Sequence, residues 1–239
     1  MGFMHELPLT ITSTYVGPTR LLTMPGLFRI FQDAAIADAE SIGFGHDVTM
    51  NQGLLWVFSR VYVRFHKAPE YLSNATFKTW PGAKKAFLFP RFGKLQNEKG
   101  EVLAELSSIW ALIHEDTRKL EMRPNLGDVD QTTGDEIPLP GKVVAKPCTL
   151  KARRRIEYSD LDLNGHMNNV RYIELLLNLH EPRFYEEKMI TELLIQYETE
   201  IKPEEVVEVL ADEDITYVRG VVDDRVCFEA NLTYGPVRK

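Results

Sequence analysis

The sequence predicts an α+β fold built from two tandem units, each a helix packed against an antiparallel sheet. Three observations predict it. Each half of the 239-residue chain has the pattern of one strand, one helix and four further strands. A stretch rich in proline, glycine and acidic residues separates the halves, as expected of a linker. The hydrophobic fraction of 44% is large enough to fill a sizeable core at this chain length.

The first unit begins with a β-branched run, LTITSTYV at 9–16, which predicts a strand. Residues 25–43 predict a helix, because Pro25 suits a first turn, apolar residues recur at helical spacing and Gly43 suits the end. The tetrapeptide NEKG at 97–100 predicts the turn between the last two strands. β-Branched and aromatic residues predict four strands, at 54–65, 74–80, 85–96 and 101–115.

The second unit follows the same order. Residues 153–158 predict a strand, and NNVRYIELLLNLH at 168–180 predicts a buried helix. Asp223 and Asp224 suit a hairpin turn. Four strands are expected, at 189–201, 206–212, 215–222 and 225–234. A helix followed by antiparallel strands buries best against one face of its sheet, and two such units can pair into a continuous sheet. This arrangement is a double hot-dog, a pseudo-dimer of two tandem hot-dog domains.

The repeat is one of architecture, because the two halves share little sequence identity. Ungapped alignment places Tyr15 on Tyr158 and Thr23 on His166, and the first half lacks the polar residues that surround His166. The domain organisation that we expect is a first unit at 1–124, a linker at 125–147 and a second unit at 148–239.

Composition argues against several classes of protein. A net charge of −7 argues against non-specific nucleic-acid binding, which needs a broadly basic surface. The two cysteines, Cys148 and Cys227, form no CxxC pair, and no His/Cys cluster has zinc spacing, so no metal site is expected. The N-terminal residues carry no secretory signal, and no window approaches the roughly 18 apolar residues of a membrane span. We expect a soluble cytoplasmic protein.

Polar side chains gather in YSDLDLNGHMNNVRYIELLL, residues 158–177, immediately before the second helix. In an extended segment, alternate side chains would share one face: Asp160, Asp162, Asn164 and His166. The simpler interpretation is a solvated face followed by a helix cap at Asn168 or Asn169. A catalytic interpretation is favoured because a helix start offers unpaired N–H groups that suit an oxyanion, and because a histidine can donate or accept a proton.

The segment DLDLNGHMNNVRYIELLL resembles the signature of acyl-acyl-carrier-protein thioesterases of the plant and bacterial type. In that family a D-x-N-x-H segment precedes NNV(K/R)YIE on the helix of the second hot-dog. LLWVFSRVYVRF (54–65) and SSIWALIHEDTRKLEMRP (107–124) resemble first-half strands of the same family, so the resemblance runs from about Tyr15 to Glu200. A lone D-x-N-x-H is weak evidence, whereas three segments in the right order are specific.

This resemblance implies that Asp162, Asn164 and His166 are catalytic and that a glutamate on a following strand is the fourth residue. IQYETEI at 195–201 supplies Glu200 for that role. The family acts on acyl chains held by acyl carrier protein, so the implied activity is hydrolysis of the thioester to free fatty acid and carrier. No metal or organic cofactor is implied, and the protein would be a monomer or a homodimer.

Strand alternation alone does not select the glutamate. Glu198, Glu200 and Glu204 all remain open on that basis, and a solvated acidic face explains them equally well. Some relatives carry a cysteine directly after the glutamate, where this chain has Ile201. Because Cys227 suits a small apolar filler in a strand, a cysteine nucleophile is disfavoured and attack by water is the hypothesis.

The resemblance also places the acyl pocket at the first helix and the strand of Trp56. Candidate lining residues are Ile30, Phe31, Ala34 and Trp56, although ordinary core is the better explanation for any one of them. From Lys142 to Arg155 the chain has six basic residues and no acid. Since acyl carrier proteins are acidic, Arg153 and Arg154 are candidates for carrier docking, with a solvated strand end as the alternative.

Three other functions stay open at this point. They are hydrolysis of acyl-coenzyme A, dehydration by a hot-dog dehydratase, and non-catalytic binding of an acyl chain or a carrier protein. The Asn164-x-His166 pair followed by Glu200 favours hydrolysis over dehydration, because dehydration needs no water nucleophile.

Overall fold

The computed structural model describes residues 4–124, 134–135 and 137–237. The first half contains β1 (His5–Thr10), α1 (Met24–Ser41), α2 (His46–Met50), β2 (Leu54–Phe65), β3 (Asn74–Pro81), β4 (Leu88–Asn97) and β5 (Val102–His114). The second half contains β6 (Thr149–Arg155), a 3-10 turn (Tyr158–Asp160), α3 (Asn169–Leu177), α4 (Phe184–Glu187), β7 (Lys188–Tyr197), β8 (Val206–Ala211), β9 (Tyr217–Val222) and β10 (Arg225–Pro236).

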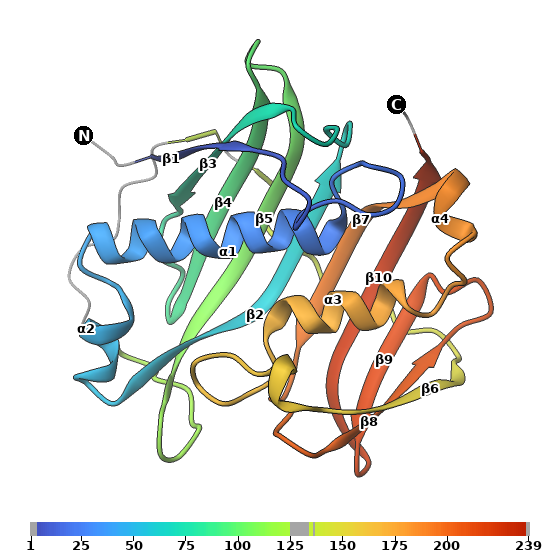
Figure 1. Ribbon diagram of the computed structural model, residues 1–239. Helices are drawn as coiled ribbons and strands as arrows, with labels where there is room; N and C mark the ends of the chain where they lie inside the picture. The colour runs from blue at the N-terminus through green and yellow to red at the C-terminus, as the bar shows by residue number, and fades with distance from the viewer. Residues whose placement is uncertain (1–3, 125–133, 136, 238–239) are drawn as a thin grey trace.

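The strands form a single ten-stranded sheet, in the order β1-β3-β4-β5-β2-β7-β10-β9-β8-β6. The halves join where β2 pairs antiparallel with β7, so that Val61 lies opposite Ile195 and both are fully buried. Helices α1 and α3 cover the same face of the sheet, one over each half (Figure 1). The predicted α+β fold of two hot-dog units in one continuous antiparallel sheet is confirmed.

Helix α1 starts and packs as its sequence dictates. The hydroxyl of Thr23 accepts a hydrogen bond from the amide of Gly26, and Pro25 occupies the first turn, where its missing N–H costs nothing. The core-facing side of the helix is fully buried, and Phe28 and Phe31 both contact Phe58 of β2 with ring centroids about 6 Å apart. This packing fixes α1 over the first half of the sheet.

Helix α3 is shorter and begins at the polar segment. The side chain of Asn168 accepts a hydrogen bond of 2.9 Å from the amide of Val170, which confirms the expected cap. Glu174 of α3 pairs with Arg29 of α1 and with Arg171, so the two helices are linked by charge as well as by packing. The start of α3 is therefore held beside α1.

The predicted edge strands were wrong in their bounds. Strand β1 is His5–Thr10 rather than 9–16, and it contains Pro8, which an edge strand tolerates because one of its sides makes no ladder bonds. Strand β6, at the other edge, is Thr149–Arg155 rather than 153–158. Edge strands pair on one side only, so their ends are weakly set by the sequence. The short helices α2 and α4 were not predicted.

The predicted linker, 125–147, lies partly outside the described residues, because residues 125–133 and 136 are not among them. Residues 137–147 form no helix or strand. Ile137 packs with Trp80 and Phe92, and the guanidinium of Arg60 donates a hydrogen bond of 2.8 Å to the carbonyl of Gly141. These contacts fasten this stretch to strands of the first half.

Candidate active site

The polar segment before α3 forms a compact polar loop at residues 162–166. The amide of Asp162 donates to the carbonyl of His166 at 2.8 Å, and the amide of Gly165 donates back to the carbonyl of Asp162 at 3.0 Å. Gly165 has φ +75°, a conformation that glycine adopts freely. The expectation of an extended 159–167 segment with alternate side chains on one face was therefore wrong, because the chain reverses at Gly165.

The carboxylate of Asp162 stabilises this loop through hydrogen bonds to its backbone amides. Its Oδ1 accepts hydrogen bonds from the amides of Asn164 at 2.8 Å and His166 at 3.2 Å. An aspartate that accepts from the backbone two residues ahead stabilises a turn of this kind. The side chain of Asp162 thus sets the positions from which Asn164 and His166 project.

Asp160 has a different role from the other polar residues of the segment. It is 2% exposed, and both carboxylate oxygens accept hydrogen bonds from Arg154, at 2.7 and 2.9 Å. The amide of Glu157 donates to the same carboxylate at 3.0 Å. Asp160 and Arg154 therefore anchor the entrance to the loop.

Glu200 lies beyond the end of β7 rather than on the strand, since β7 ends at Tyr197. Its neighbour Ile201 is fully buried, and the carbonyl of Ile201 accepts a hydrogen bond of 3.0 Å from the amide of Met167. The amide of Ile201 donates to the hydroxyl of Tyr172 on α3 at 3.3 Å. These two bonds tie the segment of Glu200 to the polar loop and to α3.

His166 and Glu200 consequently meet. His166 Nε2 lies 3.5 Å from Glu200 Oε2, and the two side chains are 12% and 30% exposed. The carbonyl of Glu200 is also held, because Arg225 donates to it at 3.0 Å. The structure thus places three of the predicted residues, Asp162, Asn164 and His166, on one loop and brings Glu200 against it.

Arg118 belongs to the same cluster, although no sequence pattern singles it out. It lies in the turn after β5, in the first half of the chain. Its Nη2 is 3.2 Å from His166 Nε2, and its Nη1 is 3.6 Å from Glu200 Oε1. No local pattern marks this residue, since its importance depends on a contact between the two halves.

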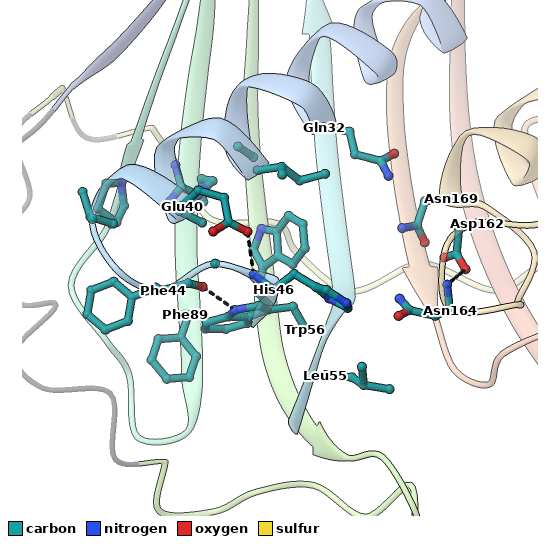
Figure 2. Close-up of a pocket in the computed structure, with 18 of the residues that line it drawn as sticks. Gln32, Glu40, Phe44, His46, Leu55, Trp56, Phe89, Asp162, Asn164 and Asn169 are labelled. Atoms are coloured by element: carbon teal, nitrogen blue, oxygen red, sulfur yellow. Dashed lines mark hydrogen bonds between the residues drawn. The ribbon is translucent and has the colours of Figure 1, made fainter. Parts of the chain in front are cut away.

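An apolar cavity of about 270 Å³ runs from the polar loop along α1. Five residues of α1 face it at helical spacing: Gln32, Ala35, Ile36, Ala39 and Glu40. Figure 2 shows Asp162, Asn164 and Asn169 at one end of the cavity, and Trp56, Phe44 and Phe89 at the other. His166 and Glu200 do not line it, whereas Asp162 and Asn164 of the same loop do.

Aromatic residues form the end of the cavity distant from the loop. Trp56 and Phe89 meet edge to face, with ring centroids 4.9 Å apart. The indole N–H of Trp56 donates to the carbonyl of Phe44 at 2.9 Å, which ties the segment between α1 and α2 to β2 (Figure 2). These contacts hold the aromatic side chains in place at this end of the cavity.

Of the four predicted acyl-pocket residues, Trp56 lines the cavity. Ile30, Phe31 and Ala34 do not line it, because they point from α1 into the main core, where each is at most 1% exposed. The cavity instead uses the neighbouring stripe of α1. Hydrophobic spacing identified the buried side of this helix, but it did not separate the stripe that packs on the sheet from the stripe beside the cavity.

The two arginines predicted for carrier docking both have partners within the chain. Arg153 pairs with Glu208 of β8 at 2.7 Å, and Arg154 holds the buried Asp160. Arg153 is well exposed, with 62% of its side chain accessible. Of the two arginines, therefore, only Arg153 can contact another protein without breaking a buried ion pair.

Three further observations bear on the chemistry. Cys227 is fully buried, and burial raises the pKa of its thiol, which opposes formation of a reactive thiolate. Burial also raises the pKa of Tyr172, so its hydroxyl keeps its proton beside Ile201. The described residues contain no group of three His, Cys, Asp or Glu side chains arranged to hold a metal ion.

None of the helices in the described part of the chain is both long and apolar enough to cross a membrane.

Comparison with known protein families gives two matches in the order of the two halves. The family described as the acyl-ACP thioesterase N-terminal domain matches residues 3–125, and the acyl-ACP thioesterase C-terminal domain matches residues 148–228. Together these matches cover most of the chain.

Among curated proteins, the chain is similar to a chloroplastic dodecanoyl-acyl-carrier-protein hydrolase of Cinnamomum camphora, with 24% identity over 231 residues. It is also 24% identical, over 234 residues, to the chloroplastic oleoyl-acyl carrier protein thioesterase 2 of Arabidopsis thaliana. These alignments cover 87% of this chain but only 59% and 63% of the relatives. The chain thus spans about three fifths of the length of the curated relatives that it matches.

Solved structures share the fold over nearly the whole chain. A crystal structure of an acyl-ACP thioesterase from Bacteroides thetaiotaomicron VPI-5482 superposes with a TM-score of 0.87 at 22% identity, covering 97% of this chain and 98% of that one. The 12:0-ACP thioesterase from Umbellularia californica superposes with a TM-score of 0.82 at 21% identity, covering 99% and 98%. At these identities the likeness establishes the fold.

Proposed function

The chain belongs to the acyl-ACP thioesterase family, and from this premise we propose that it hydrolyses a fatty acyl thioester carried on acyl carrier protein, releasing the free acid and the carrier thiol. The observation that carries the proposal is the contact between His166 and Glu200 at the loop whose residues Asp162 and Asn164 line an apolar cavity. A carboxylate and an imidazole side by side suit proton transfer from water, and the cavity suits an alkyl chain.

In the proposed mechanism, water is the nucleophile. Glu200, with Asn164 and His166, binds the water molecule, and the Glu200 carboxylate accepts its proton as the oxygen attacks the thioester carbon. The C–S bond then breaks, and the proton passes to the departing thiolate. Asp162 acts on the loop rather than on the substrate, because its carboxylate is already bonded to two loop amides. A thioester has a good leaving group, so positioning supplies much of the catalysis.

The start of α3 is the proposed site for the developing oxyanion. The amide of Val170 is occupied by the cap, and the amide of Asn168 donates to the carbonyl of Asp160 at 2.8 Å. Among the hydrogen bonds of the described residues, the amide of Asn169 has no acceptor in this turn. A free N–H at the positive end of a helix dipole is suited to an oxyanion, so we assign this role to Asn169.

We propose a division of labour between the two units. The first, at 1–124, holds the acyl chain, the second, at 148–239, supplies the catalytic side chains, and 125–147 links them. Trp56 and the α1 stripe that starts at Gln32 would contact the chain. The stripe runs over eight residue steps from Gln32 to Glu40, which corresponds to about 12 Å of helix. This length would limit the acyl chain that fits between the thioester and the aromatic residues at the far end of the cavity.

We expect Ala39→Phe to shift activity toward shorter acyl chains. Ala39 faces the part of the cavity distant from the polar loop, and a phenyl ring there fills space that a long chain would occupy. The loss on the longest accepted chain should be on the order of tenfold, since a pocket discriminates roughly 1–3 kcal/mol per methylene. The measurement is kcat/KM across a series of saturated acyl-carrier substrates.

Ala37→Phe is the matched control for this test, because Ala37 is an exposed residue of the same helix and does not line the cavity. It should leave the chain-length profile unchanged. An unaltered profile in Ala39→Phe would show that the acyl chain binds elsewhere.

We propose that the carrier docks near β6, and that Arg153→Glu raises KM for acyl-carrier substrate roughly threefold at low salt, as expected for an exposed charge. The effect should fade as salt screens charges beyond about 10 Å. A matched acyl-coenzyme A substrate is the control, because it has no acidic protein surface. Arg154→Glu is a poor test, since it would leave Asp160 buried without its partner. An equal KM for Arg153→Glu and the parent chain at low salt would remove Arg153 from the docking surface.

The proposed function is tested by thiol release from acyl-carrier and matched acyl-coenzyme A thioesters, followed with a thiol reagent. Faster hydrolysis of the carrier substrate is expected. Faster hydrolysis of the coenzyme A substrate would identify an acyl-coenzyme A thioesterase instead. Tight binding without thiol release would indicate a non-catalytic acyl- or carrier-binding protein, and loss of water from a 3-hydroxyacyl thioester would indicate a dehydratase.

A further inference from the structure

We propose that Arg118 is a positioning residue: its guanidinium fixes His166 and Glu200 relative to each other, so that the first unit completes the active site of the second. The inference rests on the proposed function for its kinetic consequence only. The contact itself, and the state of the imidazole that it selects, can be measured without any substrate.

The three groups form a closed triangle. Nη2 of Arg118 lies 3.2 Å from His166 Nε2, and Nη1 lies 3.6 Å from Glu200 Oε1. The other carboxylate oxygen, Oε2, lies 3.5 Å from the same imidazole nitrogen. One nitrogen of the rigid, planar guanidinium therefore contacts His166 and the other contacts Glu200. Displacement of either side chain would break one of these contacts.

The chemistry of the guanidinium selects one form of the imidazole. Arginine has five N–H donors and no acceptor, so a hydrogen bond between Arg118 and His166 Nε2 requires a lone pair on that nitrogen. The ring hydrogen of neutral His166 is then on Nδ1, which is buried and has no hydrogen-bond partner among the described residues. In this form the imidazole donates no hydrogen to the Glu200 carboxylate, which stays open to accept the proton of a water molecule.

Without Arg118, the form of His166 that carries its ring hydrogen on Nε2 would gain a hydrogen-bond acceptor. A hydrogen on Nε2 could be donated to Oε2 of Glu200, because those atoms already lie 3.5 Å apart. That bond would occupy a lone pair of the carboxylate and would turn the imidazole. The guanidinium thus prevents a hydrogen bond between His166 and Glu200, although it contacts both side chains and holds them close to each other.

The backbone of the turn is shaped to present Arg118. This residue has φ +55°, in the left-handed region that residues with a side chain rarely adopt. Its amide donates to the carbonyl of His114 at 2.9 Å, and the amide of His114 donates to the carbonyl of Lys119 at 2.9 Å. This turn would suit glycine and carries an arginine instead, which is one of eight non-glycine residues with positive φ in the described part of the chain.

A role in folding does not explain the residue. The Arg118 side chain is 38% exposed and that of Glu200 is 30% exposed, and ion pairs in this range contribute little to stability. Loss of the side chain should therefore change turnover and the state of the imidazole while leaving the unfolding transition nearly unchanged.

The test uses Arg118→Gly in the full chain, because glycine accepts the left-handed backbone without strain and the turn keeps its shape. Nitrogen NMR of the ring of His166 should show hydrogen on Nδ1 in the parent protein and a shift toward hydrogen on Nε2 in the variant. The kcat on acyl-carrier substrate should fall about 10- to 100-fold, as for misplaced reacting groups, with KM changed less than twofold.

Two controls separate positioning from general effects. Lys119→Ala removes the same charge from the same turn and should leave both the ring signal and kcat unchanged. Arg118→Lys should recover part of kcat, and added guanidinium ion should partly rescue Arg118→Gly. Parent-like kcat together with an unchanged ring signal in Arg118→Gly would overturn the inference.

Failure of the proposed function would look different. If the parent protein released no thiol from any acyl thioester, the function would be refuted, and the ring signal of His166 in the parent and in Arg118→Gly would still decide the role of Arg118. An Nε2–H imidazole in the parent protein would overturn the inference even if hydrolysis were fast.

Discussion

Glu200→Gln should lower kcat for acyl-carrier thioester hydrolysis by about 100-fold or more, because loss of a positioned catalytic group typically costs this much. Glutamine keeps the size of the side chain and can still contact His166, but its amide cannot accept the proton of the attacking water. The hydrogen bonds that the backbone of Ile201 makes with the amide of Met167 and the hydroxyl of Tyr172 do not involve the Glu200 carboxylate, so the local structure should persist. The measurement is steady-state thiol release together with a thermal unfolding curve.

Glu198→Gln and Glu204→Gln are the matched controls, because both glutamates are exposed residues of the same segment. Both variants should retain turnover. His166→Ala should resemble Glu200→Gln in its loss of kcat. Near-normal turnover in both Glu200→Gln and His166→Ala would remove the catalytic assignment, and loss of turnover in Glu198→Gln alone would move it to the neighbouring glutamate.

Labelled water distinguishes the two roles open to Glu200. If the carboxylate acts as a base, the label appears only in the released fatty acid. If the carboxylate attacks the thioester directly and water then cleaves the mixed anhydride at the glutamyl carbonyl, the label enters the enzyme carboxylate during a single turnover, and its appearance there would show direct attack. Mass spectrometry of the peptide that contains Glu200 reads the outcome.

The sequence was a good guide wherever one local pattern decides the structure. Helical spacing from Pro25 onward predicted α1, and the cap at Asn168 predicted the start of α3. Runs of β-branched and aromatic residues predicted the central strands, such as β2, because a buried strand must be apolar on its packed face. Those elements suffice to define two helix-on-sheet units.

The sequence was a poorer guide where hydrogen bonds outside the regular ladder prevent or end a strand. The loop around Gly165 depends on the Asp162 carboxylate, which competes with an extended strand in a way that alternation does not register. Glu200 was expected on a strand, but the amides of Glu198 and Thr199 both donate to the carbonyl of Cys227, which ends the regular pairing. Only the resemblance to a family singled out Glu200.

Contacts between the two halves were not predictable at all from local pattern. Arg118 is separated from His166 by 48 residues, and the turn that carries it has no motif of its own. The acyl-pocket candidates show the same limit, because Phe31 and Ala35 lie on one apolar side of α1 yet only Ala35 lines the cavity. Which of these α1 residues lines the cavity depends on the position of the polar loop in the second half.

Asp38→Leu should lower the free energy of unfolding by about 3–5 kcal/mol, the usual cost of removing one partner from a buried ion pair. Asp38 is 1% exposed on α1, and its carboxylate accepts a hydrogen bond of 2.5 Å from Arg91 of β4. Burial lowers the pKa of Arg91 and the Asp38 carboxylate opposes that shift, so removal of Asp38 would leave the buried guanidinium charge without its counter-ion. Urea unfolding followed by tryptophan fluorescence measures the loss.

The double variant Asp38→Leu/Arg91→Met separates the cost of a stranded charge from the value of the pair. Replacement of both partners by apolar residues of similar volume should restore most of the stability that Asp38→Leu loses, because no buried charge remains unpaired. Arg153→Ala is the matched control at an exposed pair, and it should cost less than about 1 kcal/mol. A loss below 1 kcal/mol in Asp38→Leu, or a double variant no more stable than Asp38→Leu, would show that the ion pair does not fasten α1 to β4 beside the cavity.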